Sequence, residues 1–120
     1  MEKQIEQTIT DFIKGGDNSD TELLDKVLHE EFRTANNNYL DSRGISMVNK
    51  ETYLQNIKDK VFGGTPREMI IEQIDKTGTI AFAKLQLKST TKHFFTYVSL
   101  LYDENKNWQI IFYLTDIKPL

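Results

Sequence analysis

The sequence predicts an α+β domain in which helices pack on one face of a curved antiparallel sheet. Three amphipathic helical patterns occupy the first part of the chain, and four strand-like runs crowd its C-terminal half. Helices followed by a run of strands are typical of the α+β class. At 120 residues, 38% of them apolar, the chain has the size of a single domain, residues 1–120, with a core of its own.

Apolar residues recur at helical spacing in three segments of this first part. The three stripes are Ile5, Ile9, Phe12 and Ile13; Leu23, Leu24, Val27 and Leu28; and Tyr53, Leu54, Ile57 and Val61. We expect the first helix to end at Gly15-Gly16 and the third at Gly63-Gly64, because glycine accepts the left-handed cap conformation. The second begins at the capping box formed by Ser19 and Glu22, and the third begins at Asn49 as N-cap.

Four strands are expected at about residues 67–75, 79–88, 92–102 and 107–117, joined by tight turns. A short hairpin is also expected, in which residues 32–34 and 39–41 flank a turn of three asparagines, residues 36–38.

The last two strands are largely apolar on both faces. Strict alternation places Phe112, Leu114 and Asp116 on the same face as Trp108 and Ile110. No crossover helices separate these strands, so a parallel sheet is not expected. Helices cover one face, and the other face needs a pocket or a partner subunit. A single bulge would reverse the facing of every residue that follows it in its strand.

Composition excludes several classes of function. The net charge of −3 and the pI near 5.4 argue against a nucleic-acid partner. The chain has no cysteine, which excludes disulfides and thiolate chemistry, and its two histidines are too few and too distant to predict a metal site. No cofactor motif is present. No stretch is apolar enough to span a membrane, and no secretory leader is visible. We expect a cytoplasmic protein, unless a leader has been removed and a methionine supplied.

Segments along nearly the whole chain resemble the nuclear transport factor two-like superfamily, and within it small bacterial lumazine-binding or polyketide-cyclase-like domains. The segments are residues 12–17, 20–24, 28–32, 95–102 and 107–111. The resemblance implies a cone-shaped sheet with the three helices on its concave side, a pocket between sheet and helices, and a homodimer packed through the sheet. In the ketosteroid isomerases of this superfamily a carboxylate abstracts a proton, and Asn36 stands at about that position. An amide cannot accept a proton at neutral pH.

Eight residues are the candidates for the pocket, chosen because aromatic rings line small-molecule sites and histidine or a carboxylate supplies a base. They are Phe12, Phe32, Tyr53, Phe82, His93, Tyr97, Phe112 and Asp116.

Three functions fit these residues. The first function, which we favour, is that of a small-molecule-binding domain for a compact, apolar or aromatic ligand, with no assured catalysis. The second is an isomerase, dehydratase or cyclase acting on a small cyclic substrate, with His93 or Asp116 as base and Tyr53 or Tyr97 as donor. The third is a homodimeric interaction or assembly module that uses the outer face of the sheet.

Overall fold

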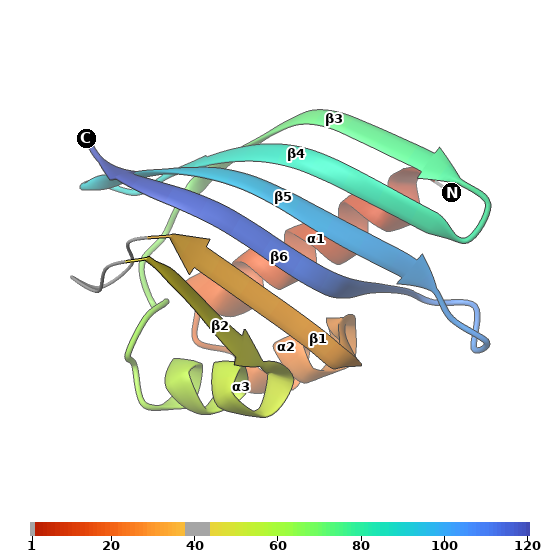
Figure 1. Ribbon diagram of the computed structural model, residues 1–120, viewed down its shortest axis with the longest axis horizontal. Helices are drawn as coiled ribbons and strands as arrows, with labels where there is room; N and C mark the ends of the chain where they lie inside the picture. Colours follow the sequence, from red (N-terminus) through yellow and green to blue (C-terminus); the bar gives the residue numbers. More distant parts are fainter. Residues whose placement is uncertain (1, 38–43) are drawn as a thin grey trace.

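A computed structural model describes residues 2–37 and 44–120, in which a curved sheet wraps around one long helix (Figure 1). The elements are α1 (Glu2–Asp17), α2 (Thr21–Val27), β1 (Leu28–Asn37), β2 (Ile45–Asn49), α3 (Lys50–Lys58), β3 (Glu68–Thr77), β4 (Ile80–Lys88), β5 (Lys92–Tyr102) and β6 (Trp108–Pro119). In this part of the chain no helix is long and apolar enough to cross a membrane.

The sheet has the strand order β2-β1-β6-β5-β4-β3 and is mixed. The four C-terminal strands pair antiparallel in sequence order, as predicted. The expectation of a wholly antiparallel sheet is wrong at β1, which runs parallel to β6 and antiparallel to β2. Parallel neighbours need a long connection, and α3 with the four strands β2, β3, β4 and β5 supplies one here. The expected second arm of the early hairpin, residues 39–41, lies outside the described residues.

The α+β class is confirmed, and the core forms where α1 lies along the inner, concave face of the sheet. Apolar residues of α1 and α2 meet the inward side chains of β4, β5 and β6. The fully buried members of this core include Ile5, Ile9, Phe12, Leu24, Leu85, Leu87, Val98, Leu100 and Ile110. The shorter helices α2 and α3 lie near β1 at the lower edge of the sheet in Figure 1.

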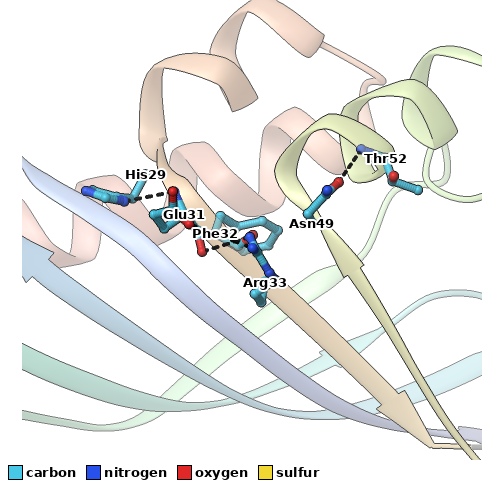
Figure 2. Close-up of polar contacts among 6 residues, drawn as sticks. All are labelled: His29, Glu31, Phe32, Arg33, Asn49 and Thr52. Atoms are coloured by element: carbon cyan, nitrogen blue, oxygen red, sulfur yellow. Dashed lines mark hydrogen bonds and ion pairs between the residues drawn. The ribbon is translucent and has the colours of Figure 1, made fainter.

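Helix boundaries follow the predicted signals in part, and α3 ends at Lys58 rather than at Gly63-Gly64. α1 ends at Asp17, just past the two glycines. The predicted cap of α2 is wrong by one residue: Leu23 N donates to Asp20 Oδ1 at 3.1 Å, and Ser19 has a left-handed φ of 51°. The cap of α3 is confirmed, because Thr52 N donates to Asn49 Oδ1 at 2.9 Å (Figure 2).

A bulge in β6 determines which side chains face the helices. Leu100 pairs with Ile110 and Ser99 with Phe112, so Ile111 is an extra residue without a partner in the ladder. Beyond it the inward residues are Tyr113, Thr115 and Ile117. The predicted grouping of Phe112, Leu114 and Asp116 with Trp108 and Ile110 is therefore wrong: Tyr113 is 7% exposed, whereas Leu114 is 46% exposed.

Candidate functional site

A cavity of about 200 Å³ opens at the end of the sheet where β1 and β6 finish. Its walls come from the C-terminal end of α1, from α3, from the loop between α3 and β3, and from the inner face of β1, β5 and β6. The lining residues are Phe12, Gly16, Thr34, Asn36, Tyr53, Ile57, Val61, Phe62, Gly63, Thr65, Arg67, Ser89, Thr91, Lys92, Phe94, Tyr113, Thr115 and Ile117.

Aromatic rings form one wall of this cavity. The ring centroid of Phe12 lies 4.9 Å from that of Tyr113 in an edge-on contact and 6.2 Å from that of Tyr53. Tyr53 in turn lies 5.2 Å from Phe62. Phe32 supports this wall from behind, with its centroid 5.3 Å from that of Tyr53. Interlocked rings of this kind keep their positions and offer flat, apolar faces to a ligand.

The part of the lining that lies on the parallel β1–β6 ladder is polar, and it meets the aromatic wall at Tyr113. The register pairs Thr34 with Tyr113 and Asn36 with Thr115, so four polar side chains lie in two neighbouring rows. Thr115 Oγ1 is also 2.8 Å from Thr96 Oγ1 on β5. Thr34 is 2% exposed, and its hydroxyl has no hydrogen-bond partner in the structure. A buried hydroxyl without a hydrogen-bond partner lowers the free energy of unfolding.

Arg67 supplies a fixed cation to the cavity. Its Nε donates to Asp17 Oδ1 at 2.6 Å, and its backbone N donates to Asp17 Oδ2 at 3.2 Å. The guanidinium carbon lies 4.9 Å from the ring centroid of Phe94. Burial alone would lower the pKa of Arg67, but the interactions with Tyr113 and Asp17 outweigh it and raise that pKa above its usual range. Arg67 is therefore charged wherever the protein is folded.

The structure brings three of the eight predicted pocket residues together. Phe12 and Tyr53 line the cavity, and Phe32 packs against both. Phe32 is fully buried and belongs to the core rather than to the lining.

The other five candidates do not line the cavity, because they lie on the outer face of the sheet. They are Phe82, His93, Tyr97, Phe112 and Asp116. The bulge at Ile111 turns Phe112 and Asp116 outward, and the pleat of β5 places Tyr97 outward between the buried Thr96 and Val98. His93 Nε2 is 2.8 Å from Gln86 Oε1 on that same face.

Sequence reasoning missed the polar half of the site, namely Arg67, Thr34, Thr115 and Lys92. Arg67 and Asp17 are fifty residues apart in the chain, so no local spacing in the sequence predicts their pairing. Asn36, placed near the base position by resemblance, does line the cavity.

His29, the other histidine, is not part of this lining. Its Nδ1 accepts a hydrogen bond from Glu31 N at 3.0 Å at the irregular start of β1 (Figure 2). Within residues 2–37 and 44–120, no three His, Asp or Glu side chains gather as they would around a metal ion.

The curved sheet around α1 and the cavity at its end belong to a fold that is shared with solved NTF2-like proteins. Residues 1–113 match the family described as "Putative lumazine-binding", and the chain belongs to this family.

Solved structures agree with this fold. An NTF2-like protein of unknown function from Shewanella baltica has a TM-score of 0.83 at 19% identity, covering 99% of this chain and 94% of its own. A second, from Silicibacter pomeroyi, has a TM-score of 0.82 at 13% identity, covering 97% and 94%. A ketosteroid isomerase-like protein from Erwinia carotovora atroseptica has a TM-score of 0.74 at 12% identity, covering 94% and 92%. No curated protein matches the chain.

Proposed function

We propose that this protein binds a compact ring-shaped organic molecule in the cavity between α1, α3 and the ends of β1 and β6. The observation that carries the proposal is the aromatic wall of Phe12, Tyr53, Phe62 and Tyr113 beside a cavity of about 200 Å³. This volume is smaller than that of typical drug-sized sites, so the ligand is one or two fused rings rather than a steroid.

The family description supports a ligand of this kind. Lumazine is a flat two-ring heterocycle with carbonyl acceptors, and the cavity offers both aromatic faces and hydroxyl donors. The isomerase-type alternative has less support, because no Asp, Glu or His occurs among the described residues that line the cavity. Proton abstraction from carbon needs such a base in contact with the substrate.

The apolar outer face of the sheet supports a second proposal, that the protein is a homodimer packed through this face. Tyr97 is 48% exposed on it, beside Leu114 and Phe95. Apolar residues exposed side by side on a sheet are typical of an interaction surface.

Native mass spectrometry of the gently purified protein tests the binding proposal first. We expect a retained small molecule, or one that is taken up when lumazine or another two-ring compound is added. Val61→Trp enlarges a side chain at the cavity mouth and should abolish uptake. Ile70→Trp places the same ring on the exposed face of β3, outside the lining, and should leave uptake unchanged. Equal uptake by both variants would place the ligand elsewhere.

A further inference from the structure

The charges that line the cavity are opposite in sign to the net charge of the protein. Arg67 and Lys92 contribute to the lining, and the lining residues that the structure describes include no carboxylate. The whole chain nevertheless carries a net charge of −3. A concave site lined by one sign of charge concentrates ligands of the other sign.

The ion pair of Arg67 with Asp17 is arranged so that its positive end faces the cavity. The side chains of Arg67 and Asp17 are only 13% and 11% exposed, and Asp17 is not among the lining residues. Asp17 engages Nε, and Nη2 of the same guanidinium lies near Gly16, a lining residue at which a Cβ atom would be 3.5 Å from it. Arginine has five N–H donors in a planar fork, and this fork matches the two oxygens of a carboxylate.

Thr34 supplies a second, independent observation that points to a ligand. Thr34 is one of the lining residues, and its buried hydroxyl has no hydrogen-bond partner in the structure. Thr34 is the β1 neighbour of Tyr113, which itself interacts with Arg67. Arg67, Tyr113 and Thr34 therefore form one group of donors, which adjoins the aromatic wall at Tyr113.

We propose that the ligand of this cavity is an anion, a ring compound whose carboxylate binds Arg67 and Thr34 while its ring lies against Phe12 and Tyr53. The inference rests on the proposed binding function and specifies its ligand class. A charged hydrogen bond is stronger than a neutral one, so the carboxylate accounts for a large share of the affinity.

Calorimetric titration with matched probes tests this proposal: 2-naphthoate against 2-naphthamide, and benzoate against benzamide. Each pair shares its ring and differs in the charge of one group. We expect the wild-type protein to bind each carboxylate about tenfold or more tightly than its amide. Equal affinities of acid and amide would overturn the proposal and leave the binding function intact. Failure of all four probes to bind would count against the binding function itself, and with it this inference.

Variants of the lining residues then test which side chain causes the preference for a carboxylate over its amide. Arg67→Gln alone would leave Asp17 buried without its cation, so the double variant Asp17→Asn/Arg67→Gln is used. We expect its preference for the carboxylate to fall to about twofold or less, with amide binding little changed. Thr34→Val preserves shape and charge and should weaken carboxylate binding severalfold. Lys118→Gln removes an exposed cation over Phe95 on the outer face and should change neither. A full preference in the double variant would overturn the assignment to Arg67.

Discussion

At Gly63 the wall of the cavity needs a residue without a side chain. Gly63 has a left-handed φ of 80°, and a Cβ atom there would lie 2.6 Å from the carbonyl oxygen of Gly16. The next residue, Gly64, donates its N–H to that oxygen at 2.9 Å. The loop before β3 thus docks on the C-terminal end of α1, and this contact holds Gly63 and Arg67 in the cavity wall.

Replacing Gly63 by alanine should therefore cost more than backbone strain alone. Gly78→Ala is the matched control, since its φ is 58° and no atom lies within 4 Å of the added Cβ. We expect Gly78→Ala to lower the free energy of unfolding by about 1 kcal/mol. For Gly63→Ala we expect about 2–4 kcal/mol, because the loop must also move off α1. Urea unfolding measures both, and equal losses would show that the loop does not depend on this contact.

Between the strands β5 and β6, a buried pair of hydroxyls replaces the apolar packing found elsewhere on the inner face. Thr96 and Thr115 are directly opposite in the ladder, and both are almost fully buried. Thr115 Oγ1 also lies 3.4 Å from the carbonyl oxygen of Phe95, which gives it a second acceptor. Among the residues that the structure describes, Thr115 is the one hydrogen-bond partner of the Thr96 hydroxyl, so the two residues depend on each other unequally.

Valine substitutions should reveal this asymmetry. Thr115→Val leaves the Thr96 hydroxyl buried without a partner and should cost about 1–3 kcal/mol in the free energy of unfolding. Thr96→Val should cost less, because Thr115 can still donate to Phe95. The double variant should cost no more than Thr115→Val alone, since no orphan remains. A urea-unfolding cycle measures the coupling, and strictly additive losses would contradict it.

Strand β6 and the elements around it show which features of the fold can be predicted from the sequence and which cannot. Periodicity predicts three helices and four C-terminal strands with boundaries that differ from the structure by a few residues, and the Asn49 cap is found correctly. The facing of the second half of β6 is not predictable, because Ile111 has no sequence feature that marks it as a bulge. The parallel β1–β6 pairing and the Asp17–Arg67 ion pair are likewise products of tertiary contact.

Across the whole molecule, the two faces of the sheet differ in what covers them. The helices pack against the inner face, and the cavity lies between this face and the helices α1 and α3. On the outer face, one row of neighbours crosses four strands, from Met47 on β2 through Ala35 and Leu114 to Tyr97 on β5. Three of these four side chains are large, apolar or aromatic, and about half exposed. We call these four residues the outer row.

The proposed homodimer should depend on the outer row. Leu114→Arg places a charge at its centre, and burying an unpaired charge against a second sheet is costly, so we expect a monomer. Leu120→Arg makes the same change at a leucine that is 67% exposed at the end of the chain, and it should remain dimeric. Sedimentation velocity over a range of concentrations distinguishes the two states. A dimeric Leu114→Arg protein, or a monomeric wild type, would exclude packing through this face. Because Leu114 points away from the cavity, the monomeric variant should still bind the ring compounds.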